Sequence, residues 1–244
     1  MTSKGEYTLC SLSFETTSNY EQNLQKLLEL IDNAPKNSFV VAPEVCLSGF
    51  DYENMQEVCN FSSYATEVIA EHSKDKTVFL TLIECKAEKI YNKLKVFHKG
   101  ELIHQRSKAK LFTFGGEHHH FEQESDAKVE IIEIEGIKVG VLICFELRFK
   151  DLWKKLEGCD LIVVPAWWGK AREDHFKTLT KALAIINQCY VVMSDSKNEE
   201  CTQISGVVTP QGKESYNGNK PCLCQEYKTK EIALMRRYMD VGIG

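Results

Sequence analysis

The chain has 244 residues, of which 43% are hydrophobic and 27% are charged, with a formal net charge of −5 at pH 7. This composition is typical of a globular protein with a sizeable core, and the mild acidity argues against binding to nucleic acid or to a membrane surface. Residues 1–10 lack the apolar segment of a secretory signal. No apolar stretch approaches the ~18 residues that a membrane span needs. We therefore expect a cytoplasmic protein.

The first part of the chain predicts alternating strands and helices. Residues 7–14 alternate as a strand does, and Asn19 can cap a helix whose apolar residues recur at helical spacing through Asp32. The apolar run 39–42 ends at Pro43 and predicts a buried strand. The next predicted elements are a helix over 64–72, a strand over 77–85, and a hairpin of 90–98 and 101–106.

The second part begins with residues 108–124, which have no periodicity and are rich in Gly, His and Phe, so we expect a loop. The following predicted elements are a hairpin of 128–134 and 137–143, helices over 149–156 and 175–187, and strands over 161–164, 190–194, 206–209 and 230–235. Helices alternate with strands, and hairpins intervene. This order predicts one α/β domain over residues 1–244 with mixed sheets rather than a purely parallel sheet.

Ten cysteines are scattered along the chain, several of them inside apolar runs, and we expect buried free thiols rather than disulfides. Cys222 and Cys224 are one residue apart, but no second pair follows at zinc spacing. The adjacent histidines 118–120 point in different directions and fit the rim of a pocket better than a metal ion. We therefore expect no metal and no cofactor.

Cys144 differs from the other cysteines in its place in the sequence. The apolar segment 137–143 stops at Cys144, and the chain then turns toward a helix. A nucleophile on a sharp strand-to-helix turn is exposed at the edge of a sheet, with backbone N–H groups nearby. Taken alone, the same pattern also describes one more buried thiol.

Two charged segments are candidates to accompany this thiol. Glu44 directly follows a predicted buried strand, where a carboxylate is costly unless it is paired or functional. The stretch Arg106 to Lys110 is basic. Taken alone, each segment has a second interpretation. Glu44 fits a solvated loop acid equally well, and the basic stretch is typical of a solvated surface.

Considered together, these segments resemble the nitrilase superfamily of carbon–nitrogen hydrolases, in that family's order. The matching segments are residues 40–44 (VVAPE), 108–112 (KAKLF), 142–149 (LICFELRF), 165–167 (PAW) and 205–212 (SGVVTPQG). The resemblance extends from Tyr7 to about Arg236. It implies a four-layer αββα sandwich built on two mixed β-sheets.

The resemblance also implies a catalytic triad. Glu44 would take the thiol proton and later activate water, Cys144 would form a thioester, and Lys108 would stabilise the oxyanion together with a backbone N–H after Cys144. The family commonly has histidine where this chain has Lys110, so the alignment selects Lys108 rather than Lys110. Glu117 matches a second family acid that positions the substrate or leaving group.

Substrate contacts are less defined by the sequence. Arg148, four residues after the nucleophile, either binds a substrate carboxylate, as in some family members, or forms an ion pair with Glu146 or another local acid. Phe145 and Trp167 are further candidates to contact the substrate, although a tryptophan is equally a core residue. His175 is read as structural, with a Cys–His dyad as the alternative.

These features predict an amidase that cleaves a non-peptide C–N bond of a small, carboxylate-bearing amide and releases ammonia or an amine. An ω-amide or an N-carbamoyl acid is the expected substrate. A nitrile hydratase-like or acyl-transfer activity, a catalytically silent scaffold protein, and a redox or zinc-binding thiol protein are the alternatives. The resemblance further implies a homodimer or a larger homo-oligomer.

Overall fold

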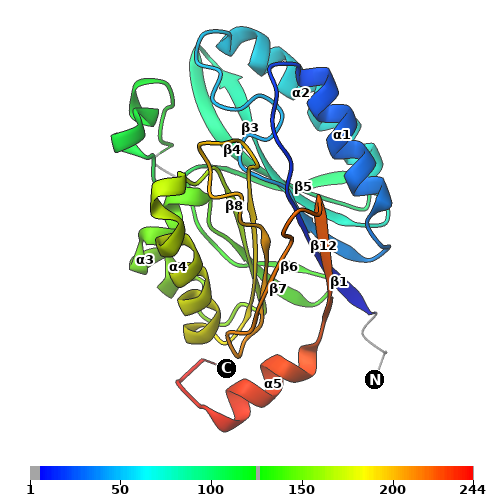
Figure 1. Cartoon of the computed structure of the whole chain (residues 1–244), viewed down its shortest axis with the longest axis vertical. Coiled ribbons are helices and arrows are strands. Elements are labelled where there is room, and N and C mark those ends of the chain that lie inside the picture. The colour runs from blue at the N-terminus through cyan, green and yellow to red at the C-terminus, as the bar shows by residue number, and fades with distance from the viewer. Residues whose placement is uncertain (1–5, 125–126, 244) are drawn as a thin grey trace.

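Figure 1 shows the computed structural model of the chain, which describes residues 6–124 and 127–243. Two β-sheets pack face to face, and helices cover their outer faces (Figure 1). The helices are α1 (Tyr20–Asn33), α2 (Met55–His72), α3 (Lys150–Lys155), α4 (Glu173–Ile186) and α5 (Thr229–Tyr238). None of the helices that the structure describes is long and apolar enough to cross a membrane.

The first sheet has six strands in the order β12-β1-β2-β3-β4-β5. The strands are β1 (Tyr7–Leu12), β2 (Ser38–Val41), β3 (Thr77–Lys86), β4 (Lys89–His98), β5 (Glu101–Ser107) and β12 (Cys222–Tyr227). β1, β2 and β3 are parallel to one another, and the other pairings are antiparallel. Helices α1 and α2 cover the outer face of this sheet, with Leu27 of α1 and Ile69 of α2 fully buried.

The second sheet also has six strands, in the order β11-β10-β9-β8-β7-β6. The strands are β6 (Ile132–Ile134), β7 (Ile137–Val141), β8 (Leu161–Ala166), β9 (Tyr190–Asp195), β10 (Gly206–Val208) and β11 (Glu214–Tyr216). β7, β8 and β9 are parallel, and antiparallel strands flank them. Both sheets are therefore mixed, and the predicted four-layer nitrilase-like α/β sandwich is confirmed.

Local sequence explains the elements that matter most for the site. The side chain of Asn19 accepts a hydrogen bond from the backbone N–H of Gln22, which caps α1 as the sequence predicts. All residues of β2, β8 and β9 are buried, as expected for central strands that are covered on both faces. Phe39 of β2 and Phe79 of β3 stack in the core between the sheets, with ring centroids 6.3 Å apart.

Several sequence predictions of individual elements are wrong. Residues 230–235 form part of helix α5 rather than a strand, because Ile232 and Met235 are buried at helical spacing and their neighbours favour helices. Helix α2 begins at Met55, well before the predicted residue 64. Strands β11 and β12 were not predicted, since their residues are only partly buried and show no apolar alternation.

The expectation that all cysteines are free is also wrong. Disulfides join Cys10 to Cys224, across strands β1 and β12, and Cys59 to Cys85, between α2 and β3. The partners are 214 and 26 residues apart in the chain. Their pairing depends on strand register and helix packing, which cysteine spacing does not reveal. Cys144 is one of the free cysteines.

Candidate active site

Three segments that are distant in the sequence meet at the ends of strands from both sheets. Glu44 follows β2, Lys108 follows β5 and Cys144 follows β7. The backbone N–H of Glu44 donates to the carbonyl oxygen of Ala166, the last residue of β8, at 3.2 Å, which ties the two sheets together here. The exposed fractions of Glu44, Lys108 and Cys144 are only 0%, 1% and 7%. Carboxyl ends of parallel strands are the usual location of a ligand site in α/β folds.

A buried lysine bridges two buried carboxylates. The Nζ atom of Lys108 donates to Oε1 of Glu44 at 2.8 Å and to Oε1 of Glu117 at 2.7 Å. Burial raises the pKa of Glu44, and the nearby Lys108 ammonium opposes that shift. Burial alone would lower the pKa of Lys108, but the two carboxylates raise it above its ordinary value.

Asn92 of β4 positions both members of the central ion pair. The side-chain Nδ2 atom of Asn92 donates to Oε1 of Glu44 at 2.8 Å. The backbone carbonyl oxygen of Asn92 accepts from the backbone N–H of Lys108, also at 2.8 Å. Sequence reasoning missed this residue. The sequence contains a signal for its role, since Asn92 lies inside the predicted strand 90–98. A buried amide group needs hydrogen-bonding partners, so such a residue is a candidate to orient its neighbours.

Cys144 lies close to the Glu44 carboxylate. Oε2 of Glu44 accepts no hydrogen bond of ordinary geometry from the described residues. The thiol of Cys144 is close enough to Glu44 to lower the pKa of the carboxyl group, a smaller effect than burial. The Sγ atom donates to the carbonyl oxygen of Trp167 at 3.5 Å. Burial, together with the charge of Glu44, raises the pKa of Cys144, so the resting group is a thiol.

The backbone at Cys144 is in the left-handed region, with φ of 44°. Such a conformation is costly for a non-glycine residue and persists only where its surroundings enforce it. Cys144 begins the 3₁₀ helix Cys144–Arg148, so Phe145 lies in its first turn. The sharp turn predicted after β7 is therefore present.

A buried arginine–glutamate pair holds the turn in place. Arg106 donates from Nη1 and Nη2 to the two carboxylate oxygens of Glu146 at 2.8 and 2.6 Å. The same oxygens accept from the backbone N–H groups of Ala109 and Ile143 at 2.6 and 2.8 Å. Glu146 thus joins the segment carrying Lys108 to the turn carrying the thiol. Because the partner of Glu146 is Arg106, the alternative in which Glu146 pairs with Arg148 is wrong. The interpretation of residues 106–110 as a fully solvated basic stretch is also wrong, because Arg106 and Lys108 are buried.

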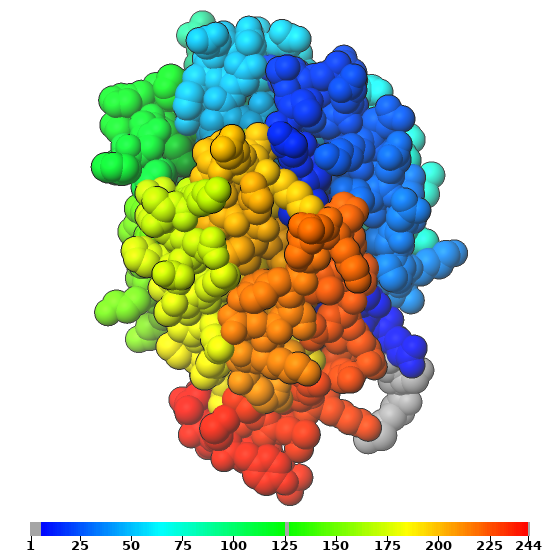
Figure 2. Space-filling model, viewed as in Figure 1, coloured from blue at the N-terminus to red at the C-terminus, as the bar shows by residue number. Residues whose placement is uncertain are grey.

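The two lysines of the basic stretch have different environments. Lys108 contacts both carboxylates, whereas Nζ of Lys110 lies 5.0 Å from the ring centroid of Phe149. The segment that follows contains two short 3₁₀ turns, Thr113–Gly115 and Glu117–His119, within the predicted loop. It projects from one side of the molecule (green in Figure 2).

Side chains around this projecting segment are held by the backbone and by aromatic contacts. Oε2 of Glu117 accepts from the backbone N–H of Phe112 at 2.9 Å, which orients the carboxylate toward Lys108. The ring of His120 stacks on Tyr52 with centroids 3.7 Å apart. These contacts place His120 beside an aromatic ring at the rim of the site.

A cleft opens beside the thiol. Its lining residues are Phe112, Cys144, Phe145, Arg148, Trp167, Trp168, Gly169 and Arg172. This lining includes the three candidates for substrate contact that follow Cys144 in the sequence, which are Phe145, Arg148 and Trp167. Arg172 was not identified from the sequence.

The two arginines of the cleft have no carboxylate partner among the described residues. The guanidinium carbon of Arg148 lies 4.7 Å from the ring centroid of Trp168, and Nη2 is 3.1 Å from Nδ1 of His175. Burial and the positive charge of Arg172 lower the pKa of Arg148. His175 contacts Arg148, while the Cys144 thiol bonds to the Trp167 carbonyl, so no Cys–His dyad is formed.

Comparison with known proteins agrees with this arrangement. Residues 8–217 match the family model described as carbon-nitrogen hydrolase. The chain is 26% identical, over 228 residues, to a 2-oxoglutaramate amidase of Bacillus subtilis, covering 88% of this chain and 87% of that protein.

Solved structures share the fold at lower identity. Nit3 of Saccharomyces cerevisiae, a nitrilase-superfamily member, aligns with a TM-score of 0.81 at 20% identity, covering 97% of this chain and 95% of that one. A mutant amidase from Nesterenkonia sp. AN1, which carries the acetamide moiety of fluoroacetamide on its active-site cysteine, aligns with a TM-score of 0.79 at 15% identity, covering 96% of each chain. Since the family match spans most of the sequence and the two mixed sheets have the family's architecture, the chain belongs to the carbon-nitrogen hydrolase family.

Proposed function

We propose that this protein is an amidase that hydrolyses the terminal amide of a small, carboxylate-bearing substrate through a thioester on Cys144. The observation that carries the proposal is a buried thiol that lines a cleft and lies close to the Glu44 carboxylate, whose Oε2 accepts no hydrogen bond of ordinary geometry from the described residues. The curated relative from Bacillus subtilis is a 2-oxoglutaramate amidase, and that substrate bears both an amide and a carboxylate.

The first half of the proposed reaction acylates the thiol. Oε2 of Glu44 takes the proton of Cys144 as Sγ attacks the amide carbon, because a thiol with a raised pKa needs a base at the moment of attack. The C–N bond of the tetrahedral intermediate then breaks. Glu44 returns the proton to the leaving nitrogen, which departs as ammonia or an amine and leaves the thioester.

The second half releases the product. Glu44 removes a proton from water, whose oxygen attacks the thioester carbon. The C–S bond breaks, the proton returns to Sγ, and the product leaves as a carboxylic acid. A carboxylate that alternates between base and acid therefore serves both halves without any net change in the enzyme.

Lys108 is the proposed electrostatic partner of the oxyanion. An ammonium group has three N–H donors, and two of them are directed to Glu44 and Glu117. The third is available to the oxyanion, together with the backbone N–H of Phe145. Glu117 fixes the direction of the lysine, so its role is that of a positioning residue. One such donor contributes about 3 kcal/mol to transition-state stabilisation.

Arg148 is proposed to bind the substrate carboxylate, with Arg172 adding positive charge to the same cleft. Changing Arg148 to Gln should raise KM for a carboxylate-bearing ω-amide by roughly 10- to 100-fold, since hydrogen bonds to charged groups contribute about 1.5–3 kcal/mol. A neutral amide of the same length should be hydrolysed by the variant nearly as well as by the parent. Ammonia release from paired substrates measures both effects.

Arg237, an exposed arginine on α5, gives the matched control. Its change to Gln removes the same charge far from the lining of the cleft and should leave both substrates unaffected. Equal losses on the charged and neutral amides in the Arg148 variant would contradict carboxylate recognition. A failure of the parent protein on every amide, with all free thiols reacting slowly, would favour the silent scaffold protein instead.

The acid side of the pH profile should report the Glu44 carboxylate. The base must be ionised, so kcat/KM falls as pH decreases through the pKa of Glu44 in the free enzyme. Burial raises that pKa above its ordinary value of 4.5, so the midpoint of the loss should lie above pH 4.5. Circular dichroism at each pH separates this titration from acid unfolding. A rate that stays level below pH 4.5 would exclude Glu44 as the base.

The proposed assembly is a homodimer or a larger homo-oligomer. Light scattering of the purified chain tests this directly, and a monomer at micromolar concentration would contradict it.

A further inference from the structure

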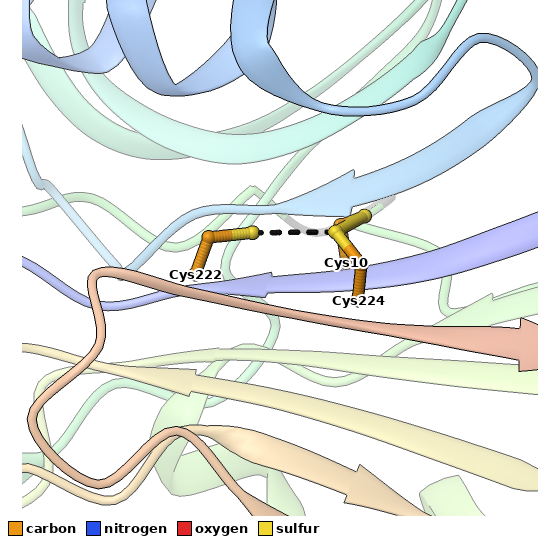
Figure 3. Close-up of side chains that lie close together, drawn as sticks. All are labelled: Cys10, Cys222 and Cys224. Atoms are coloured by element: carbon orange, nitrogen blue, oxygen red, sulfur yellow. Dashed lines mark hydrogen bonds between the residues drawn. A yellow bond between two sulfur atoms is a disulfide. The ribbon is translucent and has the colours of Figure 1, made fainter.

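A second group of reactive side chains lies outside the cleft, where β12 pairs with β1. Cys10 on β1 is directly opposite Cys224 on the antiparallel β12, and Leu12 is opposite Cys222. Alternate residues of a strand point to the same face, so the register places all three cysteines on one face of the first sheet. Figure 3 shows their sulfur atoms gathered at this strand pair.

The three sulfur atoms lie within 4.8 Å of one another. Cys10 and Cys224 form a disulfide, and Sγ of the free Cys222 is 3.4 Å from Sγ of Cys224. Among the described residues, this is the only group of three histidine, cysteine or acidic side chains close enough to share one metal ion. In the sequence, Cys222 and Cys224 had no further ligand nearby. The pairing of β1 with β12 brings Cys10 to them as a third.

The sulfur positions suit one thiophilic cation. A tetrahedral zinc–thiolate centre with Zn–S bonds of about 2.3 Å places its sulfurs about 3.8 Å apart. Reduction of the disulfide frees Cys10 and Cys224 to separate to that distance. The ligands come from two paired strands, which restricts their motion more than loops would. Cys10 is fully buried, whereas Cys224 is exposed, so water can occupy the fourth coordination position.

We propose that Cys10, Cys222 and Cys224 bind a single soft divalent cation of the zinc and cadmium class when the disulfide is reduced. A phosphine or dithiol reductant supplies two electrons and, with two protons from water, converts the disulfide to two thiols. The three thiols then lose three protons as three metal–sulfur bonds form. An added peroxide or small-molecule disulfide accepts two electrons from the two thiolates, which re-forms the Cys10–Cys224 disulfide, removes two ligands and releases the ion.

The test uses the full chain with Cys144 changed to Ala, so that the thiol of the cleft cannot bind the probe. After anaerobic reduction with a phosphine, Cd²⁺ is titrated and the thiolate-to-cadmium charge-transfer absorption is recorded. One Cd²⁺ per chain is expected, with no such absorption from the protein that was not reduced. Cys222→Ser should weaken binding by more than about 10-fold, since even a lost partner outside the ligand set costs about 10- to 100-fold.

Cys59→Ser is the matched control, because it removes one thiol from the other disulfide pair. It should bind Cd²⁺ as tightly as its parent. Circular dichroism establishes that the variants are folded, and Cys224→Ser, at an exposed position, carries the test if Cys222→Ser does not fold. Unchanged affinity in either variant of the cluster, or lost affinity in Cys59→Ser, would overturn the proposal.

Discussion

Replacing Cys144 with alanine is expected to abolish amide hydrolysis while leaving the fold intact. The thiol is the only group in the proposed reaction that forms a covalent bond to the substrate, and removing a nucleophile of this kind costs roughly 10⁶-fold in kcat. The substitution removes one sulfur beside an open cleft, so the free energy of unfolding should change by only about 1 kcal/mol. Ammonia release and mass spectrometry of an acylated chain measure the loss of activity, and urea unfolding measures the change in stability.

Cys189 offers the matched control for this experiment. It is another buried free cysteine, but it does not line the cleft. Its change to alanine should retain full activity and should retain the acyl adduct on Cys144. Turnover by the Cys144→Ala variant at more than a trace of the parent rate would remove the thioester mechanism.

Replacing Lys108 with methionine is expected to reduce both activity and stability. The lysine is the only cation that contacts Glu44 and Glu117 among the described residues. Removing one partner of a buried ion pair costs about 3–5 kcal/mol because the remaining charge is uncompensated. Loss of the oxyanion donor should reduce kcat by about 10²- to 10³-fold. Urea unfolding and steady-state kinetics give the two quantities.

The stability loss should depend on pH in a defined direction. Without the ammonium, the main opposition to the effect of burial on Glu44 is lost, so the pKa of this carboxyl group in the folded state lies further above its ordinary value of 4.5. The folded state then binds more protons, so stability falls as pH rises, and the variant should be less impaired at pH 5 than at pH 8. Lys110→Met is the control, since that lysine contacts no carboxylate of the site. Equal losses in the two lysine variants would contradict the assigned roles.

The sequence predicted the central strands because each is a mostly apolar run that ends at a proline or a turn. The segments before Glu44 and Cys144 are of this kind. Helix α5 and strand β12 were missed because they lie near the edge of the fold. Few of their residues are buried, so apolar periodicity is weak and tertiary pairing determines their conformation.

The site was predictable in its charged residues but not in the groups that hold them. Glu44 and Lys108 belong to quoted motifs and Glu117 matches a second family acid, and the structure brings the three into one hydrogen-bonded cluster. Asn92 and the Arg106–Glu146 pair were not assigned, because their importance depends on which backbone groups they reach across the fold. The Arg148–Glu146 alternative was wrong for the same reason.

The position of β12 beside β1 has a consequence for how the protein is made. β1 becomes an interior strand only when β12 joins it, although the disulfide-bonded residues of this pair are 214 positions apart. A nascent chain on the ribosome must therefore carry β1 with one unpaired edge until residues 222–227 have emerged. Long-range strand pairing of this kind is slow and exposes the chain to aggregation, so chaperones should matter most while β1 still waits for residues 222–227.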